Sequence, residues 1–281
     1  MSSESLVRQL NAEFATATWR STQRQPLQLQ QGRVIGHFRG VCLRSTFVRI
    51  VDLSGGLLGY QAQLQVDDRQ QRPLPSWVPY AMACLEDQAV IYLDRLCRTL
   101  HALNGLAHVA SGWLLLDVHP RHVQEVRQGH GQVFERLLRR CGLQPRQIVL
   151  RFQVAETIDL SHLGRSLERF RTRGFAIALV HPGDADPNQF ESLLDLAPDF
   201  IHLERPRRGL AAGEQAARLV SQVLRAHQHH CQVLVQGIDS PAQVDLAWLA
   251  GVDGLQGEFA ERVATDSAAA GHLASGAYGA L

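Results

Sequence analysis

The chain has 281 residues, 45% of them hydrophobic and 20% charged, which is typical of a globular protein with one large domain or two small ones. Its 28 basic and 27 acidic residues leave a net charge of +1, so composition provides no reason to expect a nucleic-acid partner. No apolar run approaches the roughly 20 residues of a membrane span, and the polar start is unlike a signal peptide. Five scattered cysteines without a CxxC spacing are interpreted as reduced thiols, so we expect a cytoplasmic protein with no membrane partner.

The first part of the chain predicts a helix, a linker and then strands. Residues 4–16 carry apolar side chains at helical spacing, and the Gln-rich residues 21–32 are typical of a linker. From Arg33 the pattern changes to strands, which we expect over residues 33–38, 45–51 and 57–66. A long helix should follow, because its leucines recur at helical spacing: Leu93, Leu96, Leu100 and Leu103.

Beyond that helix, apolar strand candidates alternate with amphipathic segments. The candidates are WLLLDV, IVLRFQV, FAIALV, DFIHL and CQVLVQ. This alternation predicts βαβ units in a mostly parallel sheet that is covered on both faces. About seven or eight strands over roughly 230 residues suit an α/β fold of the (β/α)₈ TIM-like barrel type better than an open sheet.

We therefore expect three parts in the chain. Residues 1–32 would form an N-terminal helix and Gln-rich linker, residues 33–265 the barrel, and residues 266–281 a frayed, small-residue tail. In such a barrel the carboxyl ends of the strands form the functional face. Polar residues fall near those predicted ends: Asp117, Gln153, His181, His202 and Gln236.

Seven stretches in order resemble motifs of the EAL domain, the cyclic di-GMP phosphodiesterase family of bacteria, from about Phe38 to Arg262. FVRIVDLSGGLLGYQAQLQ is similar to the family's opening YQPIVDL…G…GYEALLR, and LLLDVHPRH to LSVNLSPRQ. Further along, FQVAE resembles LEITE, GFAIALVHPG resembles GVRIALDDFG, and APDFIHLE resembles PDYIKID. VLVQGIDS and GVDGLQGEF are similar to VVAEGVET and GCDYLQGYL. The resemblance implies an EAL-type barrel whose first strand runs antiparallel to the others.

The resemblance also implies a two-metal site for phosphodiester hydrolysis, in which the glutamate of E-A-L is a metal ligand and the following arginine contacts phosphate. Those two positions hold Gln61 and Gln65 here, and Gln63 shares their strand face. The other site positions implied by the family are Asp117, Gln153, Val180, His181, His202, Glu204, Gln236, Asp239 and Gln256. A two-residue slide of the alignment would put Arg151 in place of Gln153, and neither is a carboxylate.

Compared with the family, three glutamates have become glutamine and one aspartate has become Val180, while Asp117 is a gained carboxylate. Neutral amides cannot balance the charge of hard cations, so we predict that the Mg²⁺ or Mn²⁺ cofactor and the phosphodiesterase activity are lost. Gln65 cannot replace the bidentate phosphate contact of an arginine, so we expect no cyclic di-GMP binding. A metal-independent cyclic di-GMP or nucleotide receptor is the alternative, in which Arg49 compensates from a neighbouring position.

The histidines leave a further alternative open. His181, His202 and Asp117 are the kind of residues that hold zinc or iron, which would make a rebuilt mononuclear site. We favour the interpretation that both histidines fill space and hydrogen-bond to Gln61, Gln153 and Gln236. His119 and His122 follow a strand end and are interpreted as rim residues.

The hypothesis that follows is a catalytically inactive EAL-like domain. It would act as a protein-interaction regulator in bacterial signalling related to cyclic di-GMP, through a protein partner of unknown identity. A homodimer is expected by analogy with the family alone. Residual phosphodiesterase activity and the rebuilt metal site are the weaker alternatives.

Overall fold

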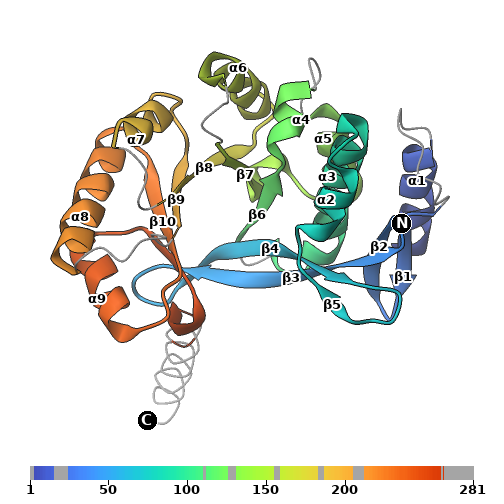
Figure 1. Cartoon of the computed structure of the whole chain (residues 1–281), viewed down its shortest axis with the longest axis horizontal. Coiled ribbons are helices and arrows are strands. Elements are labelled where there is room, and N and C mark those ends of the chain that lie inside the picture. The colour runs from blue at the N-terminus through green and yellow to red at the C-terminus, as the bar shows by residue number, and fades with distance from the viewer. Residues whose placement is uncertain are drawn as a thin grey trace, which may run out of the picture. The chain divides into compact units, whose positions relative to one another are not determined.

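The computed structural model describes residues 3–15, 25–109, 112–125, 131–154, 159–182, 187–204, 212–260 and 262 (Figure 1). Its strands are β1 (Leu27–Gln30), β2 (Arg33–Phe38), β3 (Val41–Val51), β4 (Leu57–Asp67), β5 (Pro73–Leu74), β6 (Trp113–Val118), β7 (Ile148–Gln153), β8 (Ala176–Pro182), β9 (Phe200–Glu204), β10 (Gln232–Gln236) and β11 (Gly254–Gln256). Its helices are α1 (Ser3–Ala15), α2 (Val78–Ala83), α3 (Asp87–Gly105), α4 (Pro120–Glu125), α5 (Gln132–Arg140), α6 (Leu160–Arg171), α7 (Pro187–Leu194), α8 (Ala212–Gln228) and α9 (Pro241–Ala250), with a 3₁₀ turn over Pro145–Gln147. None of these described helices is long and apolar enough to cross a membrane.

The eleven strands form one hydrogen-bonded sheet in the order β1-β2-β3-β11-β10-β9-β8-β7-β6-β4-β5. Because β3 also pairs with β4, the order of eight strands, from β3 round to β4, closes on itself. β6 pairs with β7, β8 with β9, and β10 with β9 and β11 in parallel, whereas β3 runs antiparallel to β11. The expected α/β barrel with an antiparallel first strand is confirmed.

Strand β1 lies inside the stretch that the sequence predicted as a linker, so that prediction is wrong for Leu27–Gln30. The strand pairs with β2 in an antiparallel hairpin, with Leu27 opposite Gly36. Gln31 and Gly32 join the two strands with positive φ angles of 51° and 77°, as a two-residue hairpin turn requires. The leucines alternate with glutamines, and the high glutamine content hid this period of two.

The chain divides into two compact units. Unit 1 comprises Met1–Phe47, Ala62–Ala110 and Leu114–Ala176, and unit 2 comprises Val48–Gln61, Ser111–Trp113 and Ile177–Leu281. The remaining domain boundaries predicted from the sequence stay predictions, and residues 266–281 lie outside the described part of the chain.

In unit 1, helix α3 forms the centre of the core, because one of its faces is a continuous row of buried leucines that includes Leu93, Leu96 and Leu100. Helix α1 lies beside β1 and β2 (Figure 1). The Asn11 side chain of α1 forms two buried hydrogen bonds with the backbone of Leu27, donating to its oxygen at 2.8 Å and accepting from its nitrogen at 2.9 Å. The amide of Asn11 thus replaces a neighbouring strand at the start of β1 and attaches α1 to β1.

In unit 2, parallel strands β8 to β11 form the core, and α8 packs against both α9 and β10. The interior is so crowded at Gly254 that a Cβ atom there would lie 2.6 Å from Leu234 Cδ2. The family-like turn before β4 is held by Asp52, whose Oδ1 accepts from the backbone nitrogens of Ser54 and Gly56, each at 2.8 Å. Asp52 therefore has a structural role: it holds the turn that leads into β4.

Candidate functional site

Gln61 and Gln256 form a buried amide pair in unit 2. Gln256 Nε2 donates to Gln61 Oε1 at 2.8 Å, and the two residues are only 4% and 3% exposed. The Oε1 atom of Gln256 is buried and has no hydrogen-bond partner among the described residues. The position that resembles the E-A-L glutamate is therefore a neutral amide whose oxygen already accepts a hydrogen bond from a second amide.

The register of unit 2 places further site positions on the same face of the sheet. Val180 is the partner of His202 across β8 and β9, and His202 is the partner of Leu234 across β9 and β10. Gln236 is the partner of Gln256 across β10 and β11. Register partners in a sheet point to the same side, and side chains two positions apart on one strand do so as well. Val180, His202, Gln236 and Gln256 therefore belong to one face.

His181 points to the opposite face. It follows Val180 directly, and its ring packs edge-on against Phe190 of α7 with 5.1 Å between the ring centroids. His181 and His202 are both fully buried, but the sheet lies between their side chains. His181 therefore cannot hydrogen-bond to Gln61 or Gln236 as expected, and it cannot share an ion with His202. Across the described residues, no group of three His, Cys, Asp or Glu side chains is placed to hold a metal ion.

The two carboxylates at site positions in unit 2 differ in position and exposure. Glu204 lies two residues after His202, on the same face of the sheet, and is half-buried at the end of β9, whereas Asp239 is exposed and accepts a hydrogen bond from the backbone nitrogen of Glu258 at 3.2 Å. The donors on this face are thus one carboxylate, amides and one imidazole. Divalent cations such as Mg²⁺ prefer charged oxygen ligands, so this donor set does not fit a pair of them.

In unit 1, the gained carboxylate Asp117 is paired with an arginine. Asp117 on β6 is the register partner of Arg151 on β7, and Arg151 Nη1 lies 2.8 Å from Asp117 Oδ1. The Asp117 side chain is 56% exposed, whereas that of Arg151 is only 10% exposed. Gln153 is exposed two positions beyond Arg151, so both candidates for the family glutamate lie on one face. Gln65 on β4 is also exposed.

Sequence reasoning missed a buried ionic network in unit 1. Asp94 Oδ2 lies 2.6 Å from Arg98 Nη2 and 2.9 Å from His122 Nδ1, and Asp94 Oδ1 accepts from the backbone nitrogen of His119 at 2.8 Å. His122 is only 3% exposed, so its interpretation as a rim residue is wrong. Burial alone would raise the pKa of Asp94, but Arg98 and His122 hold it well below its usual range. The signal in the sequence was an Asp and an Arg four residues apart on an otherwise apolar helix face.

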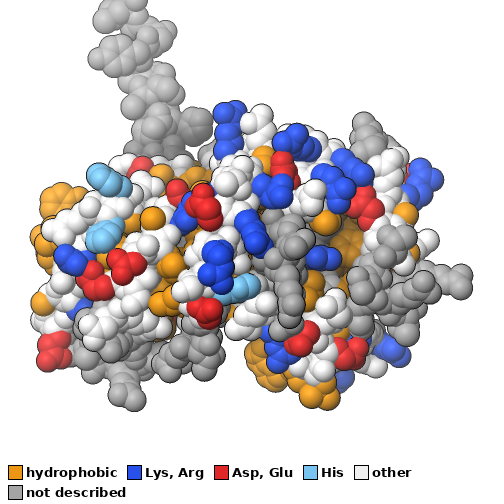
Figure 2. Space-filling model, turned by 90° about the horizontal axis from the view of Figure 1, so that it is seen from above, with side chains coloured by type: hydrophobic (Ala, Val, Ile, Leu, Met, Phe, Trp, Pro, Cys, Tyr) orange, Lys and Arg blue, Asp and Glu red, His pale blue; other side chains and the backbone are white. Residues whose placement is uncertain are grey.

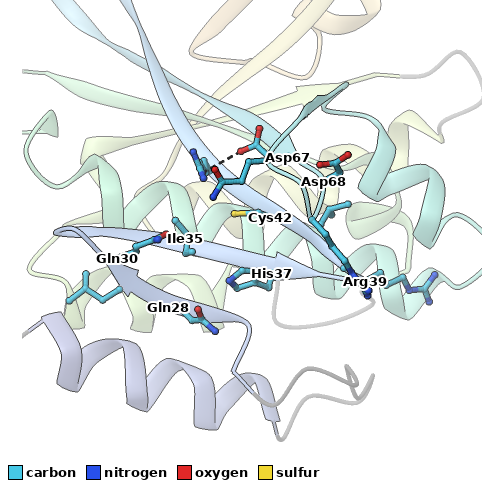
Figure 3. A pocket seen from close by; sticks show the side chains of 14 residues that line it. Gln28, Gln30, Ile35, His37, Arg39, Cys42, Asp67 and Asp68 are labelled. Atoms are coloured by element: carbon cyan, nitrogen blue, oxygen red, sulfur yellow. Dashed lines mark ion pairs between the residues drawn. The ribbon is translucent and has the colours of Figure 1, made fainter.

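A concavity of about 790 Å³ lies on unit 1, between β1, β2, β3 and the turn that leads to β5 (Figure 3). The Asp67 carboxylate points toward Arg44 there, with 3.4 Å between Oδ2 and Nε, and Asp68 accepts from Arg72 Nε at 2.7 Å. Burial lowers the pKa of His37, which lines the same concavity. None of the predicted site residues lines it, so it is separate from the family's site positions.

Comparison with known proteins agrees with the fold. The sequence model of the EAL domain matches residues 43–262. Among curated proteins, none matches the chain. The solved structures that resemble it include the Bacillus subtilis YkuI protein, with an EAL domain, in complex with substrate c-di-GMP and calcium, at 19% identity and a TM-score of 0.62 over 77% of this chain and 53% of that one.

For two further solved structures, the match covers most of their own length. A standalone EAL protein from Vibrio cholerae O395 in its c-di-GMP-bound form matches at 20% identity and a TM-score of 0.61, over 76% of this chain and 89% of that one. The FimX EAL domain from Pseudomonas aeruginosa bound to c-di-GMP matches at 18% identity and a TM-score of 0.62, over 76% and 88%. The chain spans between 53% and 62% of the length of the first four structures that it matches. The family's sequence model covers 220 residues of the chain, 43 to 262. This chain therefore belongs to the EAL domain family.

Proposed function

We propose that this chain is an EAL domain without phosphodiesterase activity that acts as a protein-interaction regulator in bacterial signalling related to cyclic di-GMP. The observation that carries the proposal is the Gln61–Gln256 amide pair, buried where the family's resemblance puts a metal-binding glutamate. Two hard cations need several anionic oxygens close by, and Glu204, half-buried at the end of β9, is the single carboxylate that the described site positions place on this face of unit 2. In unit 1, the Asp117 charge is already balanced by Arg151.

Exposed apolar side chains of unit 2 support the protein-interaction part of the proposal. Trp248 and Leu249 at the end of α9 are 65% and 73% exposed, and Leu224 on the adjoining α8 is 57% exposed. The face seen in Figure 2 likewise has small groups of hydrophobic side chains among its charged ones. Neighbouring exposed Trp and Leu side chains are uncommon on a surface that contacts only water, and aromatic residues are enriched where proteins bind one another.

The catalytic part is tested by incubating purified protein with cyclic di-GMP and Mg²⁺ or Mn²⁺ and separating the products by chromatography. We expect no linear dinucleotide above the level of a protein-free control. Metal-dependent hydrolysis that disappears in a Gln256→Ala variant would contradict the proposal. Such a result would mean that the amide row holds catalytic ions after all.

The interaction part is tested by affinity capture from a lysate of the host bacterium, with the α9 double variant Trp248→Ser/Leu249→Ser beside the wild type. We expect a protein that the wild type retains and the α9 variant loses. Leu85→Ser is the matched control, because Leu85 is 97% exposed but belongs to unit 1. Equal capture by all three proteins, or by none, would count against an interface on α9.

A metal-independent receptor for cyclic di-GMP is the second candidate, because relatives of this fold are described with that nucleotide bound. Calorimetric titration with cyclic di-GMP, with and without Mg²⁺, Mn²⁺ and Ca²⁺, separates the two functions. Binding at micromolar affinity that needs no metal would favour the receptor. The absence of heat in every condition would leave the protein-interaction module.

A further inference from the structure

A cavity of about 390 Å³ lies within unit 1, between α1, α3 and α5, away from the sheet residues at the family's site positions. Helix α1, which the proposed function does not use, forms one wall, and α3 and α5 form the others. Its volume falls at the lower end of the range of about 300–1,000 Å³ that is usual for small-molecule sites. The cavity is therefore large enough for a small organic ligand.

The charged groups around this cavity are mainly cations. Four arginines line it: Arg95, Arg98, Arg136 and Arg140. Arg98 is paired with the buried Asp94, and Arg140 forms an ion pair with Glu13 of α1. Arg95 and Arg136 form no ion pair with any described residue, so four guanidiniums and two carboxylates leave an excess of two positive charges.

Arg98 lines the cavity and is only 2% exposed. Its Nη2 atom donates to Asp94, and its guanidinium carbon lies 5.2 Å from the centroid of the Phe134 ring. Its Nε atom is buried and has no hydrogen-bond partner in the described part of the chain. A buried N–H of a guanidinium without an acceptor is costly, which points to an acceptor that comes from a ligand.

Arg95 lies three residues before Arg98, on the same face of α3, and is half-buried. It forms no hydrogen bond with any described residue. Burial and the positive charge of Arg98 lower the pKa of Arg95, and the negative charge of Asp94 offsets this only in part, so the two cations repel one another. An anion between them would offset both the repulsion and the loss of solvation.

Apart from Thr99 and His122, most of the remaining lining of the cavity is apolar. Leu10 of α1 is fully buried, and Phe134 and Leu137 of α5 are 7% and 5% exposed. Phe14 of α1 also lines the cavity and packs edge-on against Tyr92, with 5.3 Å between ring centroids. A ligand in the cavity would therefore contact both arginines and hydrocarbon side chains.

We propose that this cavity binds a small organic anion, with a phosphate or carboxylate head held by Arg95 and Arg98 and an apolar body packed between α1 and α5. Guanidinium groups suit such heads because they donate two parallel hydrogen bonds to one anion. The ligand would connect the N-terminal helix α1 to α3 and α5. This proposal does not depend on the function proposed above.

The test is calorimetric titration of the full chain with phenyl phosphate and with octanoate, which distinguish a phosphate from a carboxylate head; phenol and octanol serve as neutral analogues. We expect one of the two anions to bind at one site per chain, and Arg95→Gln to weaken that binding at least about tenfold. Arg146→Gln is the matched control, because Arg146 is exposed in the same unit but does not line the cavity. It should change the affinity less than about twofold.

The stability of the unliganded variants gives a second readout. Arg95 forms no hydrogen bond or ion pair with a described residue, and its attraction to Asp94 is outweighed by burial and by the charge of Arg98. Arg95→Gln should therefore unfold at the same or a higher urea concentration than the wild type, whereas a structural arginine would show the reverse. The proposal is overturned if neither anion binds more tightly than its neutral analogue. It is equally overturned if Arg95→Gln and Arg146→Gln weaken binding to the same extent, since the effect would then come from net charge alone.

Discussion

Relative to the glutamate that the resemblance to E-A-L implies, the glutamine at residue 61 replaces one charged oxygen with an N–H donor and leaves the size of the side chain unchanged. Burial without a cation would raise the pKa of a carboxylate and so favour its protonated, neutral form. An amide is already neutral and can both donate and accept hydrogen bonds. Gln61 accepts from Gln256, which lies 195 residues away in the sequence. The pair is thus a stable arrangement in the absence of metal, and this accounts for its burial.

Reversal of this substitution gives the first prediction. Gln61→Glu should lower the free energy of unfolding by about 1–3 kcal/mol at neutral pH, because it buries a charge that has a single amide partner. Urea unfolding with and without Mg²⁺ measures this. Gln65→Glu is the control, since Gln65 is exposed on the same strand and its variant should stay within about 0.5 kcal/mol of the wild type. If Mg²⁺ restored the stability of Gln61→Glu specifically, the site would still hold cations and our proposal would be wrong.

At the scale of elements, the segment after β11 depends on a close approach between two backbones. Gly237 and Ile238 both donate backbone hydrogen bonds to the Gln256 oxygen, at 2.8 and 3.0 Å. Gly257 has a φ of +153°, and a Cβ atom there would lie 2.4 Å from the backbone nitrogen and oxygen of Ile238. The glycine of this family-like Gln-Gly motif is therefore required for packing, independently of any catalytic role.

We expect Gly257→Ala to lower the free energy of unfolding by about 3 kcal/mol or more, because the methyl group would force the two backbone segments apart. Gly251→Ala is the control in the same unit. Gly251 also has a positive φ, of +72°, but nothing lies within 4 Å of its Cβ position, so its variant should lose only about 1 kcal/mol. Equal losses in denaturant titrations would show that strain in φ, and not the contact with Ile238, matters at Gly257.

The attachment of α1 to β1 gives another prediction at this scale. Asn11→Ala would leave the buried backbone N–H and C=O of Leu27 without their partners, at a cost of about 2–4 kcal/mol. We expect faster hydrogen exchange at the Leu27 amide and a lower unfolding midpoint. Gln9→Ala, at an exposed position of the same helix, should change neither. An unchanged exchange rate in Asn11→Ala would mean that α1 is not held by this side chain.

At the scale of the whole molecule, buried histidines make stability depend on pH. His101 is 5% exposed and forms a 2.8 Å hydrogen bond with Ser45, and burial lowers its pKa from 6.5 to about 4. Burial also lowers the pKa of His122, with a further contribution from Arg98. Between pH 6.5 and 4, His101 of the unfolded chain binds a proton that His101 of the folded protein does not. The free energy of unfolding therefore falls as the pH decreases from 6.5 to 4.

This effect is measured by urea unfolding at constant ionic strength between pH 7 and 4, for the wild type and for His101→Gln. Over that interval the wild type should lose about 3 kcal/mol more than the variant, which cannot titrate at this position. The carboxylate of Asp94 acts at lower pH, because its lowered pKa keeps it ionised in the folded protein. Parallel pH profiles of the two proteins would contradict the burial of a neutral His101.

The sequence by itself determined the barrel, the strand runs β6 to β10 and the presence of neutral side chains at several positions that resemble the family's metal ligands. These features depend on residue type and on local periodicity, which a single chain displays directly. It also located Gln61, Asp117 and Gln256, and each has a polar partner that only the structure identifies. The partner is distant along the chain in each case, so local pattern contains no information about it.

Only the tertiary structure decided which face each side chain occupies. Strand β8 is buried at nearly every position, because both of its faces are covered. Its side chains still alternate between the two faces, but their polarity does not show which face each one occupies. His181 was therefore grouped with His202, although it packs against Phe190 on the opposite side. His122 was assigned to the rim for a related reason: the carboxylate that stabilises its burial, Asp94, comes from another helix, and burial of a polar group is decided by its partners.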